Sequence, residues 1–142
     1  MRKTLIQAEL KALHSPDVAN LAGFQPDADS GFLVQIMVGP FGSAGEESFD
    51  IMVCTPEWFA ADMKRNIVSG RHYLFMKRYS YQELSNFLKD YCASCEGDSW
   101  AEVALKLSRL GHWEFDLDLH SVPGHWMLAL SSQVTYRPAQ AT

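Results

Sequence analysis

The sequence predicts an α+β fold in a single domain, with a mainly antiparallel sheet and about three helices packed on it. Strand-like segments alternate along the chain with segments whose apolar residues recur at helical spacing. Their order is three strands, a helix, a strand, two helices and one or two final strands, which favours helices on an antiparallel sheet. The chain has 142 residues, 47% apolar and 20% charged, which is enough for one compact core.

The first half of the chain predicts three strands. Residues 4–13 alternate loosely between apolar and polar side chains, which favours a strand with one solvated face. Two prolines and scattered acids mark residues 15–31 as a loop. Residues 32–38 are strongly apolar and residues 48–54 alternate. We therefore expect these two segments to form an antiparallel pair, joined by the glycine-rich turn at 39–45.

A helix follows the third strand. Thr55-Pro56-Glu57 is typical of a helix start, because threonine caps, proline at the first position loses no hydrogen bond, and glutamate favours the positive end of the helix dipole. We expect this helix to run to about Asn66. After Gly70, residues 73–76 predict another strand.

Two more helices are predicted between residues 80 and 111. Ser80-Tyr81-Gln82-Glu83 is a capping box. The helix behind it, which breaks at Gly97, has one apolar face made of Leu84, Phe87, Leu88 and Tyr91. Asp98 or Ser99 caps the next helix, which ends at Gly111. Its apolar face consists of Trp100, Val103, Ala104 and Leu107.

The end of the chain predicts one or two strands. The clearest strand pattern covers residues 113–119, where Trp113, Phe115, Leu117 and Leu119 alternate with Glu114, Asp116 and Asp118. Val122-Pro123-Gly124 predicts a turn, and residues 126–136 a last strand before a polar tail. We therefore expect a domain over residues 1–120 and a C-terminal extension over 121–142, made of one added strand and that tail.

Composition narrows the class of protein. The formal charge of −5 and the pI of about 5.4 count against a nucleic-acid partner and are compatible with a basic protein partner. No apolar stretch follows the basic residues at the start, and no run approaches the roughly 18 residues of a membrane span. The odd cysteine count, from Cys54, Cys92 and Cys95, favours a reducing compartment. We expect a soluble cytoplasmic protein without a membrane partner.

The negative charge is concentrated in one segment. Residues 90–118 contain seven acids and two bases, while the rest of the chain has ten of each. The acids of this segment are Asp90, Glu96, Asp98, Glu102, Glu114, Asp116 and Asp118. Like charges repel one another, so the segment is either a solvated face or a docking surface for a basic partner.

Signals for chemistry are weak. His112, Glu114, Asp116, Asp118 and His120 would share one face of a strand, and such side chains bind divalent metals. Same-face neighbours stand roughly 7 Å apart, so one ion would reach two of them at best. The pair Cys92 and Cys95 ends a helix, where the dipole does not activate a thiol, and Cys54 is typical of a core residue. We expect no catalytic residues, no bound metal and no cofactor.

Six short strings resemble the immunity protein 8 family, in order and with similar spacing, from about Ala8 to Phe115. They are Gln35-Ile36-Met37-Val38-Gly39-Pro40, Gly45-Glu46-Glu47-Ser48-Phe49-Asp50, Val53-Cys54-Thr55-Pro56-Glu57-Trp58, Gly70-Arg71-His72-Tyr73-Leu74, Ser94-Cys95-Glu96-Gly97-Asp98-Ser99-Trp100 and Gly111-His112-Trp113-Glu114-Phe115. The resemblance implies a non-catalytic α+β immunity protein of a bacterial polymorphic toxin or contact-dependent inhibition system. Such a protein binds and blocks a cognate toxin domain.

The acidic segment suggests where that toxin domain binds. A nuclease toxin needs a basic cleft for phosphate, and acidic side chains can occupy such a cleft or its rim. The candidate partner-binding residues, in order of preference, are Glu114, Asp116 and Asp118, then Glu96, Asp98 and Glu102, then Glu46 and Glu47. Two alternatives stay open: an adaptor domain whose partner is not a toxin, and a small metal-dependent enzyme that uses the face from His112 to His120.

Overall fold

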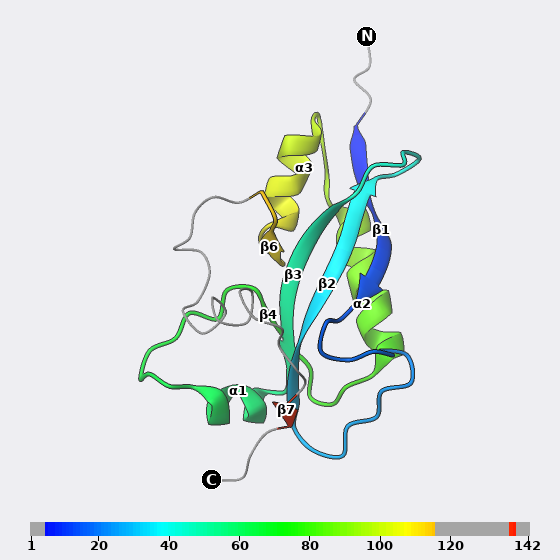
Figure 1. Ribbon diagram of the computed structural model, residues 1–142. Coiled ribbons are helices and arrows are strands. Elements are labelled where there is room, and N and C mark those ends of the chain that lie inside the picture. The colour runs from blue at the N-terminus through cyan, green and yellow to red at the C-terminus, as the bar shows by residue number, and fades with distance from the viewer. Residues whose placement is uncertain (1–4, 116–136, 139–142) are drawn as a thin grey trace.

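The computed structural model describes residues 5–115 and 137–138, and it confirms the predicted α+β fold (Figure 1). Three helices are present among these residues: α1 (Pro56–Asp62), α2 (Tyr81–Ser94) and α3 (Trp100–Leu107). The strands are β1 (Ile6–His14), β2 (Ser30–Pro40), β3 (Glu47–Cys54), β4 (Tyr73–Phe75), β5 (Glu96–Gly97), β6 (His112–Trp113) and β7 (Arg137–Pro138). Within the described part of the chain, no helix combines the length and the apolar character needed to cross a membrane.

One sheet contains all seven strands. Its order is β4-β3-β2-β1-β5, while β6 pairs with β3 and β7 pairs with β2. The predicted pairing of β2 with β3 is confirmed, with a register that runs from Gly31 opposite Cys54 to Val38 opposite Glu47. Every pairing is antiparallel except that of β3 with β4. These two strands are parallel, and the crossover that parallel strands need is supplied by α1 and its loops.

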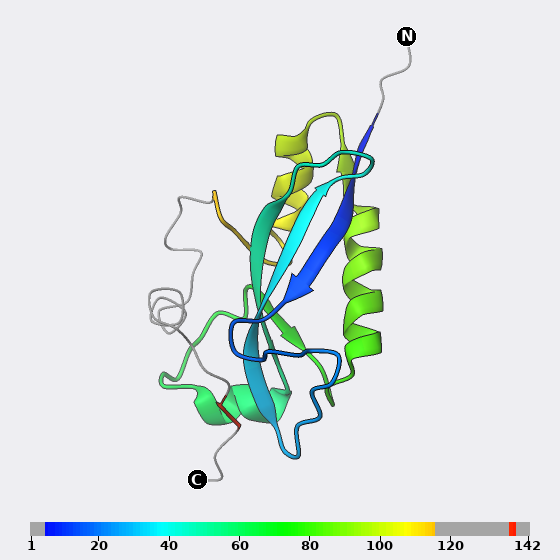
Figure 2. The same ribbon diagram turned by 45° about the vertical axis from the view of Figure 1, so that its right-hand side comes forward.

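The two faces of the sheet are buried differently. The inner-face side chains of β2 and β3 are buried and form one core with α2 and α3; they are Phe32, Val34, Ile36, Val38, Phe49, Ile51 and Val53. On the outer face, Trp58 of α1 packs with Leu33, Met52 and Cys54. Figure 2 shows the same division, with α1 near one end of β2 and β3 and away from α2. Burial on both faces explains why β2 lacks the usual alternation.

The predicted helix starts are confirmed by the capping hydrogen bonds. The side-chain oxygens of Thr55, Ser80 and Ser99 each accept a backbone N–H three residues further on. The predicted end of the first helix is wrong, because α1 ends at Asp62 and not near Asn66.

The predicted apolar face of α2 is wrong in part. Phe87 is 46% exposed, whereas Leu84, Leu88 and Cys92 are buried at a spacing of four residues. The core therefore faces the side of α2 that carries Cys92, and Phe87 lies at its margin.

A bulge changes the face of β1. The alternation of residues 4–13 predicts Ala12 on the same apolar face as Ala8 and Leu10, but Ala12 is exposed. The register with β2 shifts between Leu10 and Ala12, so Leu13 takes the core-facing position opposite Ile36. An extra residue in one strand turns the following side chains over, which is the usual effect of a bulge.

The strand predicted over residues 113–119 is confirmed at Trp113 and is wrong at Glu114 and Phe115. Strand β6 begins at His112 and ends at Trp113, and Glu114 and Phe115 form a turn. Glu114 explains the end: its N–H donates to the Ser48 carbonyl at 3.1 Å, and its carboxylate accepts the Ser48 N–H at 2.7 Å. The Glu114 carboxylate thus accepts the Ser48 N–H, which a backbone carbonyl would accept if the strand continued.

The end of the chain is described only in part. Residues 116–136 lie outside the described residues, and with them the predicted turn at 122–124 and strand at 126–136. Strand β7 pairs antiparallel with Ser30 and Gly31 of β2. The division into a domain over 1–120 and an extension over 121–142 stays a prediction.

The three cysteines are free and buried. Burial raises the pKa of the Cys54 and Cys92 thiols to about 12, and it also raises the pKa of Cys95. The thiolate is the reactive form, so each of these thiols is poorly nucleophilic in the folded protein.

We therefore expect the native protein to react slowly with 5,5′-dithiobis(2-nitrobenzoic acid) near neutral pH. All three thiols should react rapidly in urea, because unfolding restores exposure and ordinary thiol pKa values. Absorbance of the released thiolate measures both rates. One thiol that reacts as fast in buffer as in urea would contradict this assignment.

Candidate partner-binding surface

Six of the eight predicted partner-binding residues lie in the described part of the chain. They are Glu46, Glu47, Glu96, Asp98, Glu102 and Glu114, and we refer to them as the candidate surface. Glu47 is half-buried and the other five are exposed. They come from three segments that are distant in sequence: the start of β3, the stretch from β5 into α3, and the turn after β6. Asp116 and Asp118 lie outside the described residues.

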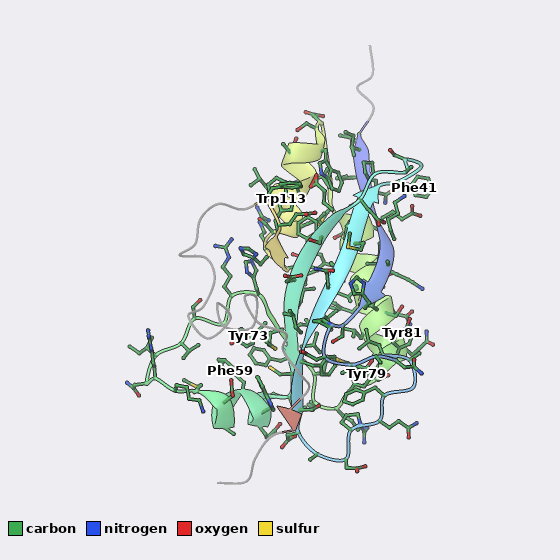
Figure 3. All side chains as sticks on the ribbon, viewed as in Figure 1. Phe41, Phe59, Tyr73, Tyr79, Tyr81 and Trp113 are labelled. Carbon is green, nitrogen blue, oxygen red and sulfur yellow. The ribbon has the colours of Figure 1, made fainter. Side chains whose placement is uncertain are left out.

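Glu47 joins these segments. One of its carboxylate oxygens accepts the indole N–H of Trp100 at 2.8 Å, and the other accepts that of Trp113, also at 2.8 Å. The three residues belong to β3, α3 and β6, and Figure 3 places Trp113 beside α3. The carboxylate therefore holds the start of α3 and the end of β6 against the start of β3.

Further hydrogen bonds organise the other acids. Glu114 bonds to Ser48, the residue after Glu47, through both its backbone and its side chain. The Glu102 carboxylate accepts the Asp98 N–H at 2.9 Å. Lys106 lies 3.9 Å from Glu102 and donates to the Glu96 carbonyl at 2.6 Å. One lysine thus offsets part of the negative charge at α3.

The same segments carry exposed apolar side chains. Phe41 in the loop before Glu46 is 68% exposed, Leu105 on α3 is 62% exposed, and Phe115 beside Glu114 is 57% exposed. Figure 3 shows Phe41 at the tip of the β2–β3 hairpin. The sequence pattern predicts Phe115 on the apolar face of a strand, and its exposure follows from the end of β6 at Trp113.

Positive charge is also segregated, which the sequence analysis missed. Residues 63–78 contain five bases and no acid: Lys64, Arg65, Arg71, Lys77 and Arg78. All five are exposed, and within the described part of the chain none makes an ion pair. They flank α1 and β4, toward the opposite end of the sheet from α3 and the β2–β3 hairpin (Figure 1). A count of charge along a sliding window would have found this segment.

A row of polar side chains crosses the outer face of the sheet. His14, Gln35, Asp50 and His112 lie opposite one another on β1, β2, β3 and β6. Gln35 donates to Asp50 at 3.1 Å, and its oxygen lies 2.8 Å from His14 Nε2.

Asp50 is a member of this row whose pKa is shifted. Burial raises the pKa of Asp50 above its ordinary 3.8, against the opposing effects of the Gln35 hydrogen bond and of His112 and His14. Glu114 raises the same pKa further by like-charge repulsion. The row is therefore polar but partly desolvated.

The strand face from His112 to His120, which the metal-dependent alternative requires, does not form in the described residues. Glu114 lies in a turn and not on a strand with His112, while Asp116, Asp118 and His120 lie outside the described part. Among the described side chains, no three of the histidines, cysteines and acids are arranged to hold a metal ion.

Comparison with known proteins assigns the class. The family model for immunity protein 8 matches residues 8–117, which is more than three quarters of the chain. The chain therefore belongs to the immunity protein 8 family, as its sequence strings indicate. This is a family of immunity proteins and not of enzymes. No curated protein and no solved structure matches the chain.

The contacts of Glu47 predict a stability effect. Glu47→Ala should lower the free energy of unfolding by about 1–2 kcal/mol, because two indole N–H groups lose a charged acceptor. Glu47→Gln should cost less, since the amide keeps one acceptor. Urea denaturation measures both. The control is Glu46→Ala, an exposed neighbour whose loss should change stability by less than about 0.5 kcal/mol. Equal effects of the two alanine variants would refute the assignment.

The raised pKa of Asp50 predicts a pH dependence. An acid whose pKa is higher in the folded state favours folding when protonated, and it loses that contribution as pH rises through the folded pKa. Asp50→Asn, which keeps an acceptor for Gln35, should therefore be more stable than the wild type near pH 7. Its advantage should disappear at a pH below the ordinary range of aspartate. Thermal unfolding of both proteins across this range tests the point, and an advantage that is constant with pH would contradict it.

Proposed function

We propose that the protein binds a cognate toxin domain of a bacterial polymorphic toxin or contact-dependent inhibition system and neutralises it by direct occlusion through the candidate surface. Membership in the immunity protein 8 family supports the class of partner. The observation that carries the choice of surface is the Glu47 carboxylate, whose bonds to Trp100 and Trp113 connect the three segments that carry these acids.

The charge of the surface favours a basic toxin. Five of its acids are exposed, and one lysine, Lys106, offsets part of their charge. A nuclease toxin binds phosphates with a basic cleft, so carboxylates that enter this cleft compete with its substrate. Opposite potentials also speed encounter at low salt, which suits an inhibitor of a lethal enzyme.

The distribution of charge would orient the encounter. The basic segment at residues 63–78 is repelled by a basic partner, while the candidate surface attracts it. A standard interface buries about 800 Å² on each partner, which is about a tenth of the 8896 Å² that this chain exposes.

The first experiment is co-expression with the cognate toxin domain, which the proposal expects in the gene immediately upstream. Restored growth and a complex that survives purification would support the function. A folded toxin domain that neither binds nor is neutralised would overturn it and would favour the adaptor alternative.

Neutralising exposed acids should weaken the complex. We expect the triple change Glu46→Gln, Glu96→Gln and Glu114→Gln to raise Kd at low salt by about tenfold or more and to flatten its salt dependence. Glutamine at 114 keeps an acceptor for the Ser48 N–H, so the fold should be retained. Titration calorimetry at about 50 and 300 mM salt measures both quantities.

The matched control removes the same charge elsewhere. Asp27, Glu57 and Glu83 are exposed and lie in the loop before β2, the first turn of α1 and the first turn of α2. Their change to Asn, Gln and Gln should leave Kd within about threefold of the wild type, since distant charges are screened. Equal effects of the two triple variants would show that net charge matters and the candidate surface does not.

A further inference from the structure

We propose that Phe115 is the apolar anchor of the candidate surface and that it inserts into an apolar pocket rimmed by arginine or lysine on the toxin domain. This inference rests on the proposed function, and it adds the chemistry that the partner must present. The argument depends on the exposure of Phe115, on the support beneath its ring and on the charges beside it.

Phe115 is exposed, yet its ring is held by a contact with the ring of Trp113. The ring is 57% exposed and packs edge-on against Trp113, with ring centroids 5.8 Å apart and planes at 81°. Trp113 in turn stacks on the buried Phe49 at 6.4 Å and 11°, and its indole N–H is held by Glu47. The core thus supports the exposed ring through one half-buried aromatic residue.

This support distinguishes Phe115 from the other exposed apolar residues nearby. Among the described residues, the Phe41 ring has no aromatic contact, and Leu105 is a flexible aliphatic side chain on the outer side of α3. A ring that is already held loses little conformational freedom when a partner covers it, so more of the burial contributes to affinity. Binding energy in interfaces concentrates in such aromatic residues, surrounded by polar groups that exclude water.

The neighbouring charges define the pocket that would accept this ring. Glu114 adjoins Phe115 in the chain, and its carboxylate reaches the backbone of Ser48, next to Glu47. An apolar pocket with acidic walls would be repelled by these carboxylates. A pocket rimmed by arginine or lysine pairs with them, and a guanidinium can also stack on the phenylalanine face.

The test uses the full chain, with the toxin domain that rescues growth in the co-expression experiment as the probe. Phe115→Ala should raise Kd at least about tenfold, because it removes the anchor. The slope of log Kd against log salt should stay as in the wild type, since no charge changes. Phe115→Leu should recover part of the affinity. An unchanged melting temperature checks that the exposed ring is not needed for folding.

The matched control is Phe87→Ala. Phe87 is 46% exposed on α2, and its ring centroid lies 6.1 Å from that of Tyr91. Phe87 is therefore also an exposed ring with an aromatic contact, but α2 contains none of the acids of the candidate surface. Its change should leave Kd within about twofold. A Phe115→Ala protein that binds like the wild type overturns the anchor and leaves the proposed function standing. A wild-type chain that does not bind the toxin domain overturns both.

Discussion

The antiparallel pairing of β2 with β3 is the constraint on which the rest of the structure depends. Its inner side chains form the main core with α2 and α3, and its outer side chains meet Trp58 of α1. The backbone of β2 and the Trp58 ring lie so close at Gly31 that no side chain fits there, since an added Cβ would lie 2.4 Å from the ring. Because β1, β4, β6 and β7 all pair with one of these two strands, their positions follow from this one ladder.

The ladder also decides where Glu47 lies. The hairpin that connects β2 to β3 delivers Glu47 to the end of the sheet that α3 and β6 approach, and its carboxylate there accepts two indole N–H groups. A half-buried carboxylate with both oxygens bonded is held more firmly than an exposed one. The positions of the acids on α3 and after β6 therefore depend on an acid that is itself largely occupied by internal contacts. Glu47 was the last of the predicted partner-binding residues, and its first role is to support the others.

Local signals in the sequence predicted the local structure. The helix caps at Thr55, Ser80 and Ser99 and the β2–β3 pair each depend on residues close together in the chain, so pattern and capping chemistry were sufficient. The errors arose where a distant residue decides. The end of β6 depends on a hydrogen bond from Ser48 to Glu114, 66 positions apart, and no periodicity reports such a contact. The face of Ala12 depends on a bulge that the alternation of residues 4–13 does not show.

The electrostatic character of the molecule is a property of the fold more than of the composition. A net charge of −5 describes a mildly acidic chain, but the five exposed bases of residues 63–78 make no ion pair with Glu102 of α3 or Glu114 after β6 among the described residues. The sheet lies between the two groups, because α1 and β4 occupy one end of β3 while Glu47 begins the other (Figure 1). Keeping opposite charges apart forgoes the attraction that pairing them would give. It leaves the basic residues 63–78 toward one end of the sheet and Glu47, Glu102 and Glu114 toward the other, so charge is unevenly distributed over the described part of the domain.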